Sequence, residues 1–284
     1  MERSPLLDAR QNIDRQYRVA GLLDSILRTL SGMGKDLNQL RPKDLAPVDE
    51  FHVRGREATV ELAHLAGLWP GGRVLDVGCG VGGSVRYLAD EHQCRATGID
   101  LTREYVETAR ALAERVGLAA KAQFVQASAL GIPFADSSFD FVWTEHAQMN
   151  IADKNRFLSE IARVLKVGGR FVFHDVLQDE GGEPHYPLPW ANDASISFLA
   201  PVAALQESLR EAGLSILSWR DKSQQSLEWF SAVGEKLKKE GRPMLGLQLV
   251  MGENARLKSQ NLVRNIQERR IRIIQAVAER MPPG

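Results

Sequence analysis

The segment Arg73-Val74-Leu75-Asp76-Val77-Gly78-Cys79-Gly80-Val81-Gly82-Gly83 decides the fold of this chain. Its first five residues have the apolar character of a short buried strand, and the glycines then turn the backbone sharply into a helix. Glycine has no side chain, so a ligand can lie directly against the peptide. We therefore expect a nucleotide-like ligand at the end of this strand, beside Gly78, Cys79 and Gly80.

Two ligands compete for this turn. Gly78, Gly80 and Gly83 satisfy the dinucleotide fingerprint G-x-G-x-x-G, and Asp100 follows at a spacing that suits a ribose hydroxyl, as in NAD-dependent oxidoreductases. Asp76, however, places a carboxylate beside the glycines, which repels a pyrophosphate and attracts a positive group. S-adenosylmethionine is positively charged and has no phosphate, so Asp76 favours it. In the alternative interpretation, Asp76 only bonds backbone amides of the turn.

Further segments follow the turn in a fixed order. They are residues 74–80, 98–101, 130–134, 136–142 and 165–170, with the sequences VLDVGCG, GIDL, LGIPF, DSSFDFV and LKVGGR. On these segments the chain resembles the class I S-adenosylmethionine-dependent methyltransferases, over about residues 50 to 220. The stretches HVRG at 52–55, HAQMN at 146–150 and PLPW at 187–190 resemble the branch named for sarcosine and dimethylglycine N-methylation.

The order of elements predicts an α/β fold with a Rossmann-like, doubly wound, mostly parallel sheet. Strands alternate with helices, which is typical of a parallel sheet covered by helices on both faces. The strands are expected at 73–77, 95–100, 122–126, 139–144, 170–176 and 214–220. Helices are expected at 83–92, from the N-cap Thr102 to Gly117, from the N-cap Asp153 to Gly168-Gly169, and at 201–212.

Three further segments flank or interrupt this core. Residues 1–50 are expected to form a helical cap, with an amphipathic helix from 8 to about 31, before a methyltransferase domain at 51–222. Residues 178–200 are rich in glycine, proline and aromatic side chains and are expected to form a substrate lid. Residues 223–284 are interpreted as a helical extension, with Ile273, Ile274 and Val277 on its apolar side. No seventh strand is evident in this tail. We expect the tail either to cover the domain or to pair two copies as a homodimer.

Composition excludes several classes of partner. Lysine plus arginine equal aspartate plus glutamate at 36 each, which removes the electrostatic motive for binding nucleic acid or an anionic membrane. No apolar run is long enough to span a bilayer, and the N-terminus does not resemble a signal peptide. The two cysteines, Cys79 and Cys94, make no disulfide framework, so we expect reduced thiols and a cytoplasmic location. The histidines and cysteines form no metal-ligand pattern, so no metal is expected.

The predicted cofactor site combines the turn with later strand ends. Asp100 is expected to hold both ribose hydroxyls, because a carboxylate accepts two hydrogen bonds at once, and Leu101 to pack on the adenine. The resemblance places an acidic residue after the third strand, where this chain has Ala127, Ser128 and Ala129. Glu145 is expected beside the methionine part. Arg54 is a candidate for clamping the ligand's carboxylate, or is an ordinary surface arginine.

Side chains that follow the fourth and fifth strands are candidates for the acceptor side. His146 follows the fourth strand and is either a base at the methyl group or a core histidine. Near the end of the fifth strand, His174 or Asp175 points at the site, because alternate strand residues face opposite sides. Trp190 in the lid suits an acceptor that becomes cationic, or it only pins the loop. The other substrate candidates are Gln148, Met149 and Asn150.

The sequence thus predicts a methyltransferase acting on a small molecule. The branch resemblance implies an amine acceptor such as sarcosine or dimethylglycine. An O-methyltransferase acting on a natural-product hydroxyl, with His146 or His174 as base, is the alternative. An oxidoreductase, or a binding module that kept the fold and lost the chemistry, is the rival from another class.

Overall fold

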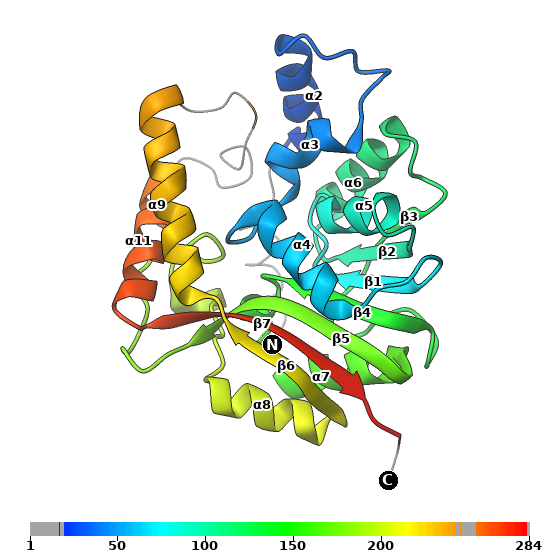
Figure 1. The fold of residues 1–284 in the computed structure, drawn as a ribbon, viewed down its shortest axis with the longest axis vertical. Helices are drawn as coiled ribbons and strands as arrows, with labels where there is room; N and C mark the ends of the chain where they lie inside the picture. Colours follow the sequence, from blue (N-terminus) through cyan, green and yellow to red (C-terminus); the bar gives the residue numbers. More distant parts are fainter. Residues whose placement is uncertain (1–16, 18–19, 242–244, 246–253, 283–284) are drawn as a thin grey trace, which may run out of the picture.

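The computed structural model describes residues 17, 20–241, 245 and 254–282. Its strands are β1 (Arg73–Val77), β2 (Arg95–Asp100), β3 (Ala122–Gln126), β4 (Phe139–Glu145), β5 (Leu165–Gln178), β6 (Leu214–Asp221) and β7 (Ile271–Arg280). They form one seven-stranded sheet in the order β3-β2-β1-β4-β5-β7-β6 (Figure 1). The first five strands in this order run parallel, and β7 runs antiparallel to both of its neighbours. The expected doubly wound α/β fold is confirmed.

Helices cover both faces of the sheet. They are α2 (Leu22–Gly32), α3 (Pro42–Asp49), α4 (Gly55–Ala66), α5 (Gly83–Asp90), α6 (Arg103–Arg115), α7 (Lys154–Val164), α8 (Val202–Glu211), α9 (Ser223–Glu240) and α11 (Ala255–Gln267), with short 3-10 turns at Gln148–Asn150 and Ala194–Ile196. Apolar side chains of α4, α5 and α6 pack on one face of the sheet. Those of α7 and α8 pack on the other face.

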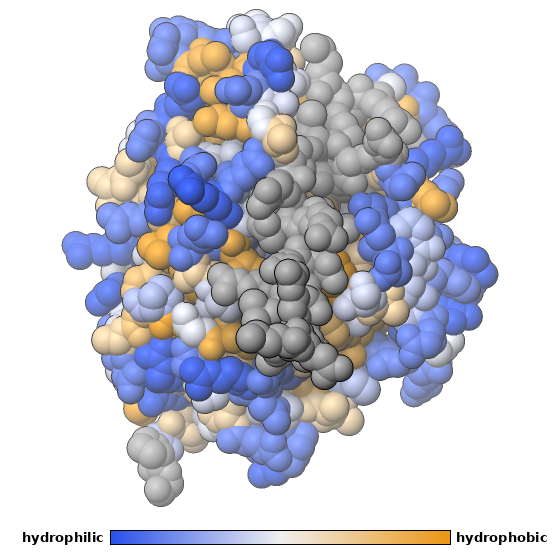
Figure 2. Space-filling view, turned by 180° about the vertical axis from the view of Figure 1, so that it is seen from behind, coloured by the Kyte–Doolittle hydropathy of each residue, from blue (hydrophilic) through white to orange (hydrophobic). Residues whose placement is uncertain are grey.

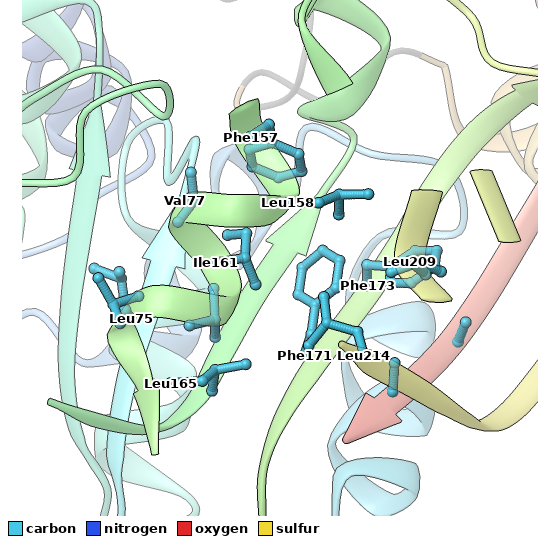
Figure 3. Close-up of a cluster of buried hydrophobic side chains, with 14 of the residues drawn as sticks. Leu75, Val77, Phe157, Leu158, Ile161, Leu165, Phe171, Phe173, Leu209 and Leu214 are labelled. Atoms are coloured by element: carbon cyan, nitrogen blue, oxygen red, sulfur yellow. The ribbon is translucent and has the colours of Figure 1, made fainter. Parts of the chain in front are cut away.

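The α7 face holds the larger buried cluster. Phe157, Leu158 and Ile161 of α7 lie over side chains of β1 and β5, as Figure 3 shows. These helix positions are three and four residues apart, which places them on one side of the helix. Each fully buried side chain of this size contributes roughly 1.5–3 kcal/mol. The cluster therefore holds the parallel strands in register, and their carboxyl ends meet at one edge of the sheet.

The junction between α7 and β5 differs from the prediction. Asp153 caps α7 as expected, its side chain accepting a hydrogen bond from the Arg156 amide at 2.9 Å. The helix ends at Val164 rather than at Gly168-Gly169, and β5 already begins at Leu165, which pairs with Phe139 of β4. Backbone pairing with β4 therefore replaces the last helical turn that the apolar spacing indicated.

The interpretation of the C-terminal segment as wholly helical is wrong. Helices α9 and α11 account for its first part, but residues 271–280 form β7, which lies between β5 and β6. Ile273, Ile274 and Val277, expected on one side of a helix, are strand residues buried on both faces of the sheet. The seventh strand, which was not evident in the sequence, is present as β7. Pairing of two copies through this segment stays a prediction.

The N-terminal helices pack beside the glycine turn. Of the helix expected over 8–31, the structure describes Tyr17 and, after a left-handed Gly21, the helix α2 from Leu22. Residues 8–16, 18 and 19 lie outside the described residues. Leu22, Ile26 and Leu30 of α2 share a buried cluster with α3 and α6. At the end of α3, Asp49 forms a buried ion pair with Arg86 of α5, with a 2.5 Å contact. The cap and the nucleotide fold are therefore in direct contact.

The segment 178–200 lies against α11. Asn265 accepts a hydrogen bond from the His185 amide at 2.8 Å and donates one to the His185 carbonyl at 2.9 Å. Asn261 donates to the Pro187 carbonyl at 3.0 Å. The C-terminal segment thus anchors the expected lid. The domain boundaries expected at residues 50 and 222 stay predictions.

One face of the described chain is mainly hydrophilic. Figure 2 shows hydrophilic residues over most of one described face, with apolar residues in small groups. No described helix combines the length and the apolar character needed to cross a membrane. Cys79 and Cys94 are both buried and free.

Candidate active site

A cavity of about 440 Å³ lies where the parallel strands end. Residues after β1, β2, β3 and β4 form one side of it, and residues of the N-terminal cap and the 178–200 loop form the other. Predicted site residues that line it are Asp76, Gly78, Cys79, Gly80, Asp100, Leu101, Ala127, Ser128, Ala129, Glu145, His146, Met149, Asn150 and Trp190. The carboxyl edge of an open parallel sheet is where such folds bind ligands.

The glycine turn is tied to β2, and two of its positions suit glycine for different reasons. The amides of Gly78 and Cys79 both donate to the Ile99 carbonyl, at 2.8 and 3.0 Å, which ties the turn to β2. Gly78 has a φ of 84°, and a Cβ there would lie 2.6 Å from the Cβ of Ala147. Gly80 has a φ of 52° and borders open space, since a Cβ there would meet nothing within 4 Å. A ligand can therefore approach the backbone closely at Gly80.

Asp100 is held rigidly at the end of β2. Its Oδ2 accepts a hydrogen bond from the Gly80 amide at 3.0 Å, and its Oδ1 accepts one from the Thr102 amide at 2.8 Å. Burial raises the pKa of Asp100, and these amides oppose that effect. Each carboxylate oxygen keeps a further lone pair, so Asp100 can still accept bonds from a vicinal pair of hydroxyls. The geometry fits the ribose of a nucleoside.

The surroundings of Asp76 favour a positively charged ligand. Its side chain is 3% exposed, and among the described residues no donor bonds its carboxylate. Burial, followed by the charges of Glu145 and Asp100, raises the pKa of Asp76 well above its usual value. A cationic ligand relieves this cost, whereas a phosphate increases it. The acidic wall therefore fits a cofactor such as S-adenosylmethionine better than a dinucleotide.

Glu145 connects β4 to the N-terminal cap. Its Oε2 accepts hydrogen bonds from Ser84 at 2.5 Å and from the Trp143 indole at 2.8 Å, and its Oε1 lies 3.4 Å from His52 Nε2. His52 Nε2 also lies 2.8 Å from Glu50 Oε2. Burial alone would lower the pKa of His52, but Glu145 and Glu50 outweigh it and raise the pKa to about 9. His52 is therefore an imidazolium at neutral pH.

Small side chains border the opposite end of the cofactor region. Leu101, Ala127, Ser128 and Ala129 line the cavity after β2 and β3. The Ser128 hydroxyl accepts a hydrogen bond from the Leu130 amide at 3.2 Å, which orders the loop. An adenine ring needs such a narrow apolar slot, with few polar contacts.

His146 occupies the junction between the cofactor region and the acceptor end. It has a φ of 51°, and its amide donates to the His174 carbonyl at 2.8 Å. Its Nε2 is buried and has no hydrogen-bond partner in the part of the chain that the structure describes. Burial, with smaller effects of His174 and His52, lowers the pKa of His146 well below its usual value. His146 is therefore a neutral imidazole.

Asn150 joins three segments at the acceptor end. Its amide donates to the Trp190 carbonyl at 3.1 Å and to the Ile196 carbonyl at 2.8 Å, while its Oδ1 accepts from the Tyr17 hydroxyl at 2.7 Å. The Trp190 indole donates to Ser197 at 3.0 Å, which fixes the ring in the loop. The side chains that surround this end are mostly apolar: Tyr17, Phe51, Met149, Ile151, Pro189, Trp190 and Phe198.

Comparisons with known proteins agree with this geometry. A methyltransferase domain family model matches residues 75–173. An O-methyltransferase, resE, of Aspergillus sclerotiorum is 33% identical over 184 residues, which cover 63% of this chain and 68% of the relative. A sarcosine/dimethylglycine N-methyltransferase of Halorhodospira halochloris is 28% identical over 224 residues, covering 78% of this chain and 79% of the relative.

The chain belongs to the class I S-adenosylmethionine-dependent methyltransferases. The fold agrees with the crystal structure of geranyl diphosphate C-methyltransferase from Streptomyces coelicolor A3(2), in complex with Mg²⁺, a geranyl-S-thiolodiphosphate and S-adenosyl-L-homocysteine. That comparison has a TM-score of 0.70 at 17% identity and covers 98% of this chain and 100% of the other.

Three predicted site residues of this methyltransferase do not line the cavity. Arg54 instead forms two hydrogen bonds with Glu61, at 2.7 and 2.8 Å. His174 is fully buried behind His146, with ring centroids 5.0 Å apart, and its Nε2 lies 3.0 Å from the Val53 carbonyl. Burial lowers the pKa of His174 to about 3. Gln148 is also buried away from the cavity, so β-strand alternation and the 3-10 turn, rather than sequence proximity, select which side chains reach it.

The neighbouring carboxylate, Asp175, has a structural role. Its Oδ2 accepts hydrogen bonds from the amides of Ala147 and Gln148, at 3.2 and 2.9 Å, and its Oδ1 accepts one from the Val176 amide at 2.8 Å. These bonds shape the chain that follows β4 and so fix the position of His146. Asp175 is thus a support for the site of the methyltransferase and does not reach the cavity itself.

Several cavity residues of the methyltransferase were not predicted as site residues. Tyr17, Asp49, Phe51 and His52 come from the N-terminal segment, and Phe198 comes from the end of the lid. The motif HVRG at 52–55 indicated this region, but the sequence analysis took Arg54, and not His52, as its candidate ligand contact. Only the folded cap shows which of these side chains turns inward.

One cluster has the residue types of a metal site. Ligand-type atoms of Glu50, His52 and Glu145 all lie within 4.8 Å of one another. Each already has protein partners: His52 bonds Glu50, and Arg56 pairs with Glu50 at 2.8 Å. We assign no ion to this cluster, and the expectation of no metal stays a prediction.

Proposed function

We propose that this methyltransferase methylates a hydroxyl group of a small molecule with a largely apolar body, with His146 as the general base. One observation carries the proposal: His146 places a neutral imidazole at the wall of a cavity whose acceptor end is aromatic and apolar. A hydroxyl acceptor needs a base within reach, whereas a neutral amine needs none in the transition state.

The cofactor roles follow from the geometry of the cavity. Asp100 accepts hydrogen bonds from the ribose, while Leu101, Ala127, Ser128 and Ala129 flank the adenine. Gly78, Cys79 and Gly80 let the ligand lie against the backbone. Asp76 and Glu145 face the positive methionine end, where their carboxylates lower the energy of bound cations.

Catalysis then depends mainly on alignment and exclusion of water. When bound, S-adenosylmethionine supplies a methyl group whose bond to sulfur breaks, leaving a neutral thioether, as the bond to the acceptor oxygen forms. The imidazole of His146 takes the hydroxyl proton. Because burial lowers its pKa, His146 is a weak base, which suits a phenolic hydroxyl better than a less acidic alcohol.

The described cavity wall has no lysine or arginine, and the imidazolium of His52 is already flanked by Glu50 and Glu145, which disfavours a zwitterionic acceptor. Sarcosine and dimethylglycine each carry a carboxylate, which loses hydration in a cavity and needs a compensating cation. An amine acceptor remains the second candidate for two reasons. A relative named sarcosine/dimethylglycine N-methyltransferase matches 78% of the chain, and Trp190 at the cavity wall can attract a methylated cation.

An assay of S-adenosylhomocysteine release tests the proposal. A panel of phenols, aliphatic alcohols, sarcosine and dimethylglycine is compared for wild type and His146→Asn. We expect turnover with phenols, a fall in kcat of about 10²–10⁴-fold in the variant, and little change in cofactor affinity.

The control is His64→Asn, since His64 lies exposed on α4 and should be silent. Turnover confined to sarcosine or dimethylglycine, and undiminished in His146→Asn, would replace the hydroxyl acceptor by the amine. Methylation of no compound, despite tight cofactor binding, would favour a binding module.

A further inference from the structure

Two segments that are distant in the sequence form much of the acceptor end of the cavity. Met149, Asn150 and Ile151 follow β4 and line it, and Trp190 and Phe198 of the lid line it as well. No backbone pairing of long strands joins a lid of this kind to the rest of the wall, so single hydrogen bonds between the two segments carry the connection. The shape of the acceptor end therefore depends on those bonds.

Lys154, the first residue of α7, bonds both segments with one ammonium group. Its Nζ donates to the Gln148 carbonyl at 2.8 Å and to the Phe198 carbonyl at 2.7 Å, and it also donates to the Ile151 carbonyl. An ammonium group has three N–H donors, so each donor has a carbonyl partner. Two of these carbonyls belong to the segment after β4, and the third belongs to the end of the lid.

The surroundings of Lys154 are otherwise unfavourable for a cation. The N-terminus of a helix carries a partial positive charge, which repels an ammonium group. Burial lowers the pKa of Lys154 to about 8, and the charge of Asp175 opposes this effect. Lys154 is therefore still charged at neutral pH, and its three carbonyl bonds compensate for the hydration that it has lost. It acts as a fixed cross-link rather than as a solvated surface lysine.

Phe198 is held through both of its backbone polar groups. Its amide donates to the Met149 carbonyl at 2.7 Å, while its carbonyl accepts the bond from Lys154. Asn150 attaches the lid a second time, at the Trp190 carbonyl. The Lys154 bond thus fixes the residue whose ring lines the acceptor end at the close of the lid.

We propose that Lys154 is a positioning residue for the methyl acceptor: its ammonium group holds the end of the lid on the segment after β4 and so sets the shape of the acceptor end. Lys154 does not line the cavity itself and acts through Phe198. The proposal rests on the proposed function, in that the acceptor binds at this end. The glycine turn and Asp100, which are assigned to the cofactor, lie on other elements and should not respond.

Hydrogen exchange measured by mass spectrometry tests the cross-link without any acceptor. Lys154→Met keeps an aliphatic side chain and removes the three donors. In the free protein, we expect the amides of residues 189–200 to exchange about tenfold faster than in wild type, while those of residues 74–102 keep their rates. Lys121→Met is the matched control and should change neither segment, because Lys121 is exposed just before β3, at the opposite end of the strands.

Steady-state kinetics then test the effect on the acceptor, using the phenol that wild type methylates fastest. Lys154→Met should raise the acceptor KM by at least about tenfold and leave the affinity for S-adenosylhomocysteine unchanged. Lys154→Arg, which keeps a cation with several donors, should restore most of the acceptor affinity. Phe198→Ala should also raise the acceptor KM, and the double variant should be no worse than the poorer single variant, because both substitutions act through one contact.

Unchanged exchange at residues 189–200 in Lys154→Met would overturn the role of Lys154. Equal losses of acceptor and cofactor affinity, or additive effects of the Lys154 and Phe198 substitutions, would do the same and leave the proposed function intact. If Lys154→Met does not fold, Lys154→Gln, which keeps two donors, replaces it and should change exchange and KM in the same direction. If wild type methylates no compound, the proposed function fails, whereas the exchange measurement still decides whether Lys154 holds the lid.

Discussion

At the scale of single residues, the predicted cofactor region contains two carboxylates, Asp100 and Asp76, which differ in how the protein itself bonds them. Asp100 orders the glycine turn through Gly80 and starts α6 through Thr102, with the same two oxygens that face the cavity. Asp76, at the end of the neighbouring strand, makes no such bonds within the described chain. We therefore expect the two acids to differ in role: Asp100 would orient a ligand, and Asp76 would supply charge.

Replacing Asp100 by asparagine should show its double role. The amide keeps one acceptor oxygen but turns a donor toward a backbone amide or a ribose hydroxyl. We expect affinity for S-adenosylhomocysteine to fall by about tenfold or more, equivalent to about 1.4 kcal/mol, measured by calorimetry. Asp136→Asn is the control, because Asp136 is 74% exposed and pairs with Arg163 at the surface. An unchanged affinity in Asp100→Asn would remove Asp100 from the ribose site.

At the scale of secondary-structure elements, β2 and the glycine turn pack without room for a methyl group. Gly98 of β2 faces Cys79: a Cβ there would lie 2.6 Å from the Cys79 sulfur and 2.9 Å from Phe124. Cys79 in turn lines the cavity. A change in the middle of β2 is thus transmitted to the turn that borders the cofactor.

Gly98→Ala should therefore destabilise the fold by about 1–3 kcal/mol, measured by chemical denaturation, and weaken cofactor binding as well. Gly131→Ala is the matched control, since a Cβ at Gly131 would meet nothing within 4 Å and its φ is not positive. The control should change stability by less than about 0.5 kcal/mol. Equal effects of the two substitutions would show that the Cys79 contact does not limit packing.

At the scale of the whole molecule, β7 closes the fold. It pairs with β5 along Arg170–Gln178 and with β6 along Leu214–Asp221, so β6 reaches the sheet only through β7. Its side chains belong to buried clusters on both faces. The last strand of the described chain thus joins β6 to β5, whose paired residues precede those of β7 by about one hundred positions in the sequence.

Removal of residues 271–284 should abolish cooperative folding. Both edges that β7 now pairs would be exposed, together with the apolar side chains beneath it. We expect no cooperative thermal transition by circular dichroism and no increase in melting temperature on addition of S-adenosylhomocysteine. A chain shortened only by residues 282–284 is the control and should melt like wild type. Normal melting of the longer truncation would show that β5 and β6 are stable without β7.

The sequence was most informative where local pattern and burial agree. The bounds of β1, β2 and β3 coincide with the predicted strands. The strands β1 and β2 lie inside the parallel sheet and are largely buried, whereas β3 lies at its edge and alternates buried with more exposed residues, and both patterns are typical of strands. In β7 the same signal is ambiguous. Ile273, Ile274 and Val277 suit one side of a helix as well as a strand buried on both faces, and only pairing with β5 and β6 decides between them.

The sequence by itself determined the family, the doubly wound sheet and the residues at the strand ends that line the cavity, because glycine turns and carboxylates act through local backbone geometry. The tertiary structure alone decided that His52 enters the cavity while Arg54 leaves it, and that His146 lines it while His174 lies behind. These outcomes depend on how the cap and the lid pack over the sheet. Such packing is set by contacts between distant segments, which no local spacing encodes.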